Sequence, residues 1–238
     1  KAYNMKAVYE KEIKSYFLTL QGYVFIGVFL LISGYFFVTY NVLESNSDIS
    51  EMLDNLIVSF ILLIPLLTMR LFAEERHMKT DKVYMSAPIS AWQIAVGKYL
   101  AAFTVYAAAV VLSSVSGWVM VFMSGRSVGE MICTYLGFIL IGGSFTAIGM
   151  YVSAMTENQI VAAVISFCVC FFLYIADWLL DFGTNPVYTS VVKAISITAW
   201  YDNFLIGILD IPAVLYFLTV TALFVFFTVM KLEKRRCG

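Results

Sequence analysis

Residues 99–125 read YLAAFTVYAAAVVLSSVSGWVMVFMSG and contain no charged side chain. A helix needs about 20 mostly apolar residues to cross the hydrocarbon core of a membrane, so this run is long enough to span one. Five further uncharged runs occupy residues 15–43, 55–69, 131–156, 158–176 and 211–230. The runs are continuous, whereas the strands of a membrane barrel would alternate apolar and polar residues. The sequence therefore predicts an all-α polytopic membrane protein with six transmembrane helices.

We expect one membrane-spanning domain over residues 1–238, with spans at about 16–40, 55–73, 97–123, 131–155, 158–180 and 211–230. The second span is the shortest, because its uncharged run ends before Arg70 and contains Pro65. The long side chain of Arg70 can reach the headgroups, which would let residues 71–73 complete the crossing. Residues 6–17 mix apolar and charged side chains, as a helix lying at the membrane interface does.

The basic residues lie mostly in one set of loops. Thirteen of the fifteen Lys and Arg residues fall in the N-terminal segment, the loop between the second and third spans, and the C-terminal tail. Because basic loops remain in the cytoplasm, both termini and this loop are predicted to be cytoplasmic. We expect a multi-pass protein of a plasma membrane, bacterial in origin. A net charge of −1 gives no reason to expect a nucleic-acid partner.

The loop after the second span concentrates charge in an otherwise apolar chain. Seven of the 31 charged residues lie in residues 70–82. Arg70 and Glu74 are four residues apart, as are Glu75 and Lys79, so each pair can meet on one face of a helix. The pattern predicts a short charged helix.

Leu71, Met78 and Met85 recur every seven residues, which adds a narrow apolar stripe and extends the predicted helix over residues 70–85. Ser90 and Gln93 then have the spacing of a capping box that begins the helix of the third span. A protruding helix with mixed charge and exposed methionine suits a protein partner. The alternative is a loop that is charged only because it is solvated.

Several catalytic classes are excluded by missing motifs. The chain has no G-x-x-x-x-G-K-[ST] sequence to bind ATP phosphates, no G-x-S-x-G sequence, and a single histidine, so H-E-x-x-H is impossible. Glu74, Glu75 and Lys79 are similar to the E-E-x-x-x-R motif of CAAX-type membrane proteases, but those enzymes also use histidines that are lacking here. We expect no catalytic, cofactor-binding or metal-binding residue, and an intramembrane protease is the weakest alternative.

Four stretches carry a family resemblance. Residues 70–101 read RLFAEERHMKTDKVYMSAPISAWQIAVGKYLA and residues 154–167 read AMTENQIVAAVISF, and residues 12–37 and 203–236 agree in order. Together they resemble type-2 ATP-binding-cassette permeases, especially the gliding-motility-permease-like branch. The family often has a glycine before Thr80, where this chain has lysine, so the helix is expected to be more continuous here.

The resemblance implies a dimeric permease of an exporter, paired with a second copy or a paralogue. Two soluble ATPase subunits would bind beneath it and hold the ATP and Mg. The coupling helix that meets the ATPase would include Glu74, Glu75, Arg76, Met78 and Lys79.

A second cytoplasmic contact would be Thr156, Glu157, Asn158 and Gln159, which also form a capping-box pattern. A tight turn with a good cap explains that pattern equally well.

Between the fifth and sixth spans, the apolar pieces 194–201 and 203–209 are too short to cross a membrane. The resemblance implies a pair of re-entrant half-helices there, forming an outer gate region with Trp200, Tyr201 and Phe204. An uncharged path rich in Phe and Tyr favours an amphipathic, lipid-linked or peptide cargo. A stand-alone secondary transporter or channel is the alternative function.

Overall fold

The computed structural model describes residues 5–44, 49–80, 89–124, 127–182 and 186–237. Regular structure in these ranges is helical throughout. Six helical stretches are long and apolar enough to cross a membrane: Leu20–Leu43, Ile49–His77, Ala91–Met123, Val128–Met155, Gln159–Leu179 and Ile211–Arg236. The predicted all-α polytopic fold with six spanning helices is confirmed.

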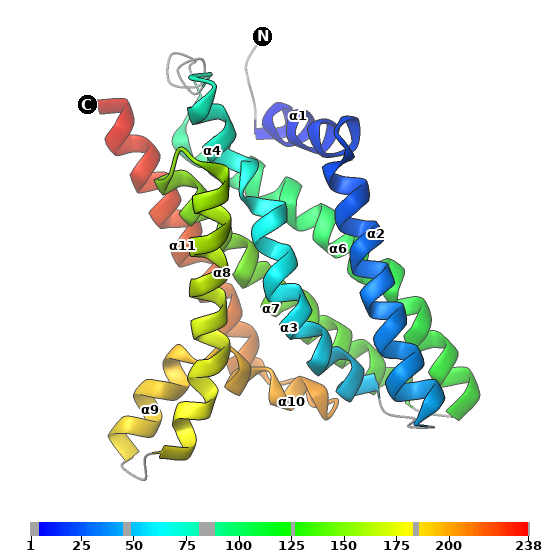
Figure 1. Ribbon diagram of the computed structural model, residues 1–238. Helices are drawn as coiled ribbons and strands as arrows, with labels where there is room; N and C mark the ends of the chain where they lie inside the picture. Colours follow the sequence, from blue (N-terminus) through cyan, green and yellow to red (C-terminus); the bar gives the residue numbers. More distant parts are fainter. Residues whose placement is uncertain (1–4, 45–48, 81–88, 125–126, 183–185, 238) are drawn as a thin grey trace.

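The long helices run between two ends of a bundle (Figure 1). They are α2 (Leu20–Phe36, prolonged by a π-helical segment, Phe37–Leu43), α3 (Ile49–Thr68), α6 (Ala91–Ser124), α7 (Val128–Met155), α8 (Gln159–Ile175, followed by a 3₁₀ segment, Ala176–Phe182) and α11 (Ile211–Cys237). One end carries α1 (Met5–Leu18), α4 (Arg70–His77) and the C-terminal end of α11, and is called the α4 end below. The opposite, α10 end carries α9 (Pro186–Ile195), a 3₁₀ turn (Thr198–Trp200) and α10 (Asp202–Leu205).

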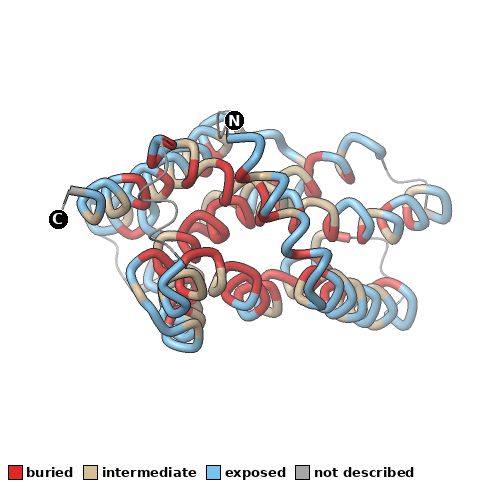
Figure 2. The backbone as a smooth tube through the Cα atoms, turned by 90° about the horizontal axis from the view of Figure 1, so that it is seen from above, coloured by how far each residue is buried: buried red, intermediate tan, exposed pale blue. Residues whose placement is uncertain are grey.

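The bundle is built around α3 and α7, whose residues are mostly buried, whereas only a minority of the residues of α2, α8 and α11 are buried. Buried positions lie toward the middle of the bundle and exposed ones around its outside (Figure 2). Because the exposed residues of the outer helices are largely apolar, this outer surface suits contact with lipid.

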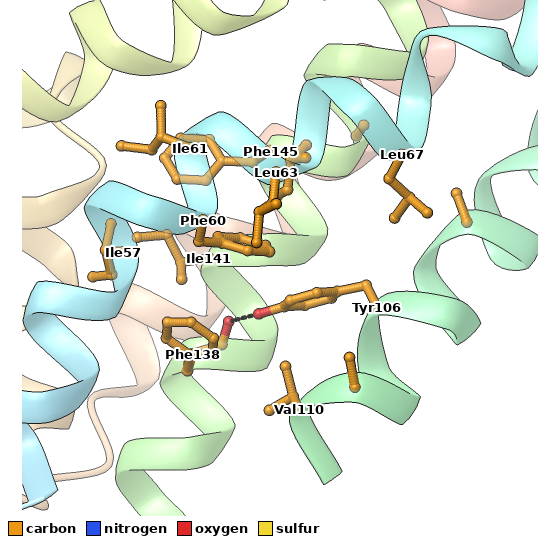
Figure 3. Close-up of a cluster of buried hydrophobic side chains, with 14 of the residues drawn as sticks. Ile57, Phe60, Ile61, Leu63, Leu67, Tyr106, Val110, Phe138, Ile141 and Phe145 are labelled. Carbon is orange, nitrogen blue, oxygen red and sulfur yellow. Dashed lines mark hydrogen bonds between the residues drawn. The ribbon is translucent and has the colours of Figure 1, made fainter. Parts of the chain in front are cut away.

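The middle of the core is aromatic (Figure 3). The ring of Phe60 on α3 lies 4.6 Å from that of Tyr106 on α6 and 5.4 Å from that of Phe138 on α7. The Tyr106 hydroxyl donates a hydrogen bond to the Phe138 carbonyl oxygen, which satisfies the one polar group in the cluster. A Cβ on Gly142 would lie only 2.2 Å from the Tyr106 ring, so a glycine is needed for α6 and α7 to approach this closely.

The chain bends between α3 and α4, near Pro65. The Ser153 hydroxyl of α7 accepts hydrogen bonds from the amides of Phe72 and Ala73 and donates one to the Met69 carbonyl. A side chain inserted into the backbone ladder is a recognised cause of a helix bend. The helical stretch that contains the predicted second span, residues 55–73, extends over Ile49–His77.

Candidate functional site

One face of α4 is held by a network of four charges, of which three are largely buried and the fourth, Lys11, is exposed. Lys98 of α6 is 1% exposed, and its Nζ lies 3.0 Å from Glu12 Oε1 of α1 and 2.9 Å from Glu75 Oε2 of α4. Lys11 Nζ of α1 lies 2.9 Å from Glu75 Oε1 and 3.3 Å from Glu12 Oε1. Two bases and two acids therefore join three helices, and each buried charge has opposite charges beside it, as burial requires.

Lys98 makes two further contacts with α4. Its Nζ donates a hydrogen bond of 2.6 Å to the Leu71 carbonyl oxygen and lies 4.9 Å from the centre of the Phe72 ring. The sequence-based interpretation counted Lys98 only as one of thirteen basic residues in the predicted cytoplasmic segments and assigned no role to Glu12. It therefore missed the network. The sequence signal that could have indicated the network is that Lys98 directly precedes an uncharged run, while acidic residues lie on two other segments.

The prediction that Glu75 pairs with Lys79 is wrong, because Glu75 is drawn to Lys98 and Lys11. Glu75 therefore does not face solvent, and its side chain is only 15% exposed. The predicted pair of Arg70 and Glu74 is present, with Nε and Oε2 3.9 Å apart.

The exposed tip of α4 is shorter than predicted. The helix ends at His77, and Lys79 follows with φ of 56°. The Lys79 amide donates to the Arg76 carbonyl and the Thr80 amide donates to the Glu75 carbonyl, which is the hydrogen-bond pattern of a Schellman motif. The helix is therefore not continuous at the position of the family's glycine, because lysine adopts the left-handed conformation there.

The prediction that Leu71, Met78 and Met85 form one apolar stripe is also wrong for Leu71 and Met78. Leu71 is buried, whereas Met78 is 63% exposed. Met85 lies outside the described residues. The capping box of Ser90 and Gln93 is confirmed, since each side chain accepts a hydrogen bond from the backbone amide of the other residue.

The turn between α7 and α8 lies next to α4. Arg76 Nη2 forms an ion pair of 2.6 Å with Glu157 Oε1, which joins the two predicted contact segments directly. The predicted capping box in this turn is wrong. Asn158 is the N-cap of α8 and accepts a hydrogen bond from the Ile160 amide. Thr156 is the C-cap of α7, and its hydroxyl donates to the Val152 carbonyl. Gln159 is the first residue of α8.

The residues predicted for an outer gate pack at the α10 end. Trp200 Nε1 donates to the Lys193 carbonyl, and its ring stacks on Tyr216 at 5.2 Å. Tyr201 and Phe204 are buried, with 1% and 0% exposed. Helix α9 was not foreseen, and the short elements here replace the predicted pieces 194–201 and 203–209.

Three carboxyl groups influence one another near this end. Burial raises the pKa of Asp202 above its ordinary value, and the charges of Asp177 and Asp54 raise it further. The described residues hold no group of His, Cys, Asp and Glu side chains suited to a metal ion.

The arrangement combines six spanning helices with two joined segments at the α4 end. A family model described as "ABC-2 family transporter protein" matches residues 13–231. The chain belongs to this family of ABC-transporter permeases. No curated protein matches the chain. Membership makes it a multi-pass membrane component of a transport system, in which permeases generally work with an ATP-binding subunit.

Proposed function

We propose that this ABC-2 permease couples ATP hydrolysis on a separate ATPase subunit to the export of an amphipathic, lipid-linked or peptide cargo. The ATPase would dock on the tip of α4 and on the α7–α8 turn and would supply the ATP and Mg sites. A second permease copy or a paralogue would complete the dimer, and the α4 end would face the cytoplasm.

The ion pair between Arg76 and Glu157 is the observation that carries the docking proposal. It brings two segments 81 residues apart in sequence into one surface. Met78, Lys79 and Thr80 are exposed beside this pair, so apolar and charged groups are available to a partner. Protein interfaces combine such anchors with a charged surround.

The network behind this surface supports the coupling part of the proposal. A displacement of α4 would reach α1 through the ion pair of Glu75 with Lys11, and α6 through the ion pair of Glu75 with Lys98. A stand-alone transporter or channel has no need of an exposed tip joined to a rigid base. The docking proposal therefore accounts for both sides of α4.

The test uses Met78→Asp, because reversing Glu75 would break the network that holds α4. A tagged chain is purified from its native membranes, and the ATP-binding subunit that co-purifies is quantified together with its ATP hydrolysis. Loss of an exposed anchor costs about 1–2 kcal/mol, so association should fall about 5- to 30-fold. Expression and thermal stability of the permease should not change.

The matched control is Met123→Asp, which introduces the same charge at an 80% exposed methionine at the far end of α6. It should retain the ATP-binding subunit. The docking proposal fails if no ATP-binding subunit accompanies the wild-type chain, or if Met78→Asp retains it as well as the control does.

The orientation has its own test. In a background without the native cysteines, Ser127→Cys should react with an impermeant maleimide added to intact cells, whereas Lys79→Cys should react only after lysis. Ser127 precedes α7 at the end of the bundle opposite α4. The reverse labelling pattern would put α4 outside the cell and remove the docking site from ATP.

A further inference from the structure

Two hollows adjoin at the α4 end. A polar cavity of about 180 Å³ lies between α1 and α4 and is lined in part by Lys11, Glu12, Thr19 and Glu74. An apolar groove of about 370 Å³ runs between α2 and α3 and is lined in part by Val24, Phe25, Val28, Leu63 and Leu66. Gln21 and Arg70 line both hollows, so they mark the junction.

The charges in the polar cavity differ in what they contact. Lys11 and Lys98 lie against Glu12 and Glu75 at 2.9–3.3 Å, as described for the network. Arg70 is different, because its buried Nε has no hydrogen-bond partner among the described residues. Its ion-pair partner Glu74 lies 3.9 Å away, which is too far for a hydrogen bond.

An unsatisfied cationic donor at the edge of an apolar groove is suited to a ligand that has both an anionic and an apolar part. A guanidinium group binds phosphate oxygens through charge-assisted hydrogen bonds, and it does so best where donors are left unsatisfied. Apart from Gln21 and Arg70, the groove is lined by apolar side chains, most of them on the spanning helices α2 and α3. A ligand that fits both hollows has a phosphate at one end and an alkyl chain at the other.

The charge balance of the cavity limits which kinds of lipid headgroup fit it. Its lining contains three bases and three acids: Lys11, Arg70, Lys98, Glu12, Glu74 and Glu75. A cavity without net charge favours a headgroup without net charge. The carboxylate of Glu74 lies beside Arg70 and can accept a hydrogen bond from an ammonium group.

We propose that this junction is a binding site for a zwitterionic phospholipid with a primary amine. The phosphate contacts Arg70, the amine lies near Glu74, and one acyl chain occupies the groove between α2 and α3. The lipid fills the space between the surface helix α1 and the spanning helices. The polar cavity extends to Met78 and Thr80, so the lipid site adjoins the proposed ATPase docking surface at the tip of α4. Arg70 lies at the first residue of α4, outside that docking surface, so Arg70→Gln tests lipid binding separately from docking.

The experiment is native mass spectrometry of the detergent-purified chain, with phosphatidylethanolamine added as the probe. Wild-type protein should retain the lipid, and Arg70→Gln should weaken retention about tenfold or more, since it removes a charged hydrogen-bond donor. Val28→Trp should weaken retention without touching the headgroup, because it fills the groove. Lys14→Gln is the matched control: it removes an exposed charge on α1 outside both hollows and should retain the lipid.

Two competitors sharpen the result. Diacylglycerol with the same acyl chains lacks the phosphate and should not displace the probe, and phosphatidylglycerol should displace it at least severalfold less well than unlabelled phosphatidylethanolamine. Equal retention by Arg70→Gln and Lys14→Gln, or equal competition by any of these lipids, would overturn the proposal. Thermal stability of Arg70→Gln should match that of wild type, because the side chain is 41% exposed, so lost binding would not report unfolding.

Discussion

The two ends of the bundle are held together by different physical means. At the α4 end, Lys98 is almost fully buried among carboxylates from two other helices. At the α10 end, Phe204 is buried against Phe217 and against the backbone of Gly137, with no charge in the contact. Charges fix direction and partner, whereas apolar contacts depend mainly on volume.

This difference bears on function. A buried charge that loses its partner costs more than one whose whole network is replaced, so the α4 end tolerates only concerted changes. A charge network of this kind suits α4 if α4 moves as one body with α1 and α6. The α10 end instead depends on close packing, and a change in volume alone should disturb it.

The largest effect is expected from breaking the network at Lys98. Lys98→Met leaves Glu12 and Glu75 with only Lys11 between them, and removing one partner of a buried charge pair costs about 3–5 kcal/mol. Thermal unfolding of the detergent-purified chain should show this loss. Adding Glu12→Gln and Glu75→Gln to Lys98→Met should recover most of the stability, because no carboxylate then remains uncompensated.

If Lys98→Met alone were as stable as wild type, the charges would not be mutually dependent. The contrast between the two ends would then disappear. A triple variant less stable than Lys98→Met would contradict the argument in a different way, since it would assign the stabilisation to side-chain shape.

A smaller loss is expected from overfilling the α10 end. In Gly137→Ala the new Cβ would lie 2.5 Å from Phe204 Cβ, and overpacking costs about 1–3 kcal/mol. Gly34→Ala is the matched control, because no atom lies within 4 Å of its added Cβ and alanine favours a helix. Thermal unfolding should place Gly137→Ala below wild type and Gly34→Ala at or above it. Equal stability of the two variants would mean that α10 yields to added volume.

The sequence predicted the parts of this fold that depend on neighbours along the chain. Uncharged runs gave the six spans, and the spacing of Ser90 and Gln93 gave a helix start. Both signals are local, because hydrocarbon length and capping geometry act within about 20 residues.

The contacts of the candidate site join distant segments, and there the sequence was less informative. Glu75 was given a partner four residues away, but Lys98 and Lys11 compete for it from other helices. Ser153 reaches the α3–α4 bend from α7, and no pattern in residues 65–73 indicates it. Local pairing rules assume that no third group approaches, and in a buried site that assumption fails.

The smallest expected effect concerns the backbone at the tip of α4, where Lys79 occupies the left-handed region. That conformation costs an L-residue about 1–2 kcal/mol, and glycine avoids the cost. Glycine also makes the unfolded chain more flexible, which offsets about 0.4–1 kcal/mol of the gain. Lys79→Gly should therefore stabilise the chain by about 0.5–1 kcal/mol in thermal unfolding. Lys79→Ala removes the same charge but keeps a Cβ, so it should give no gain. Similar shifts in the unfolding temperature of both variants would mean that the loss of charge causes the effect. The tip of α4 would then interact electrostatically with the charge network.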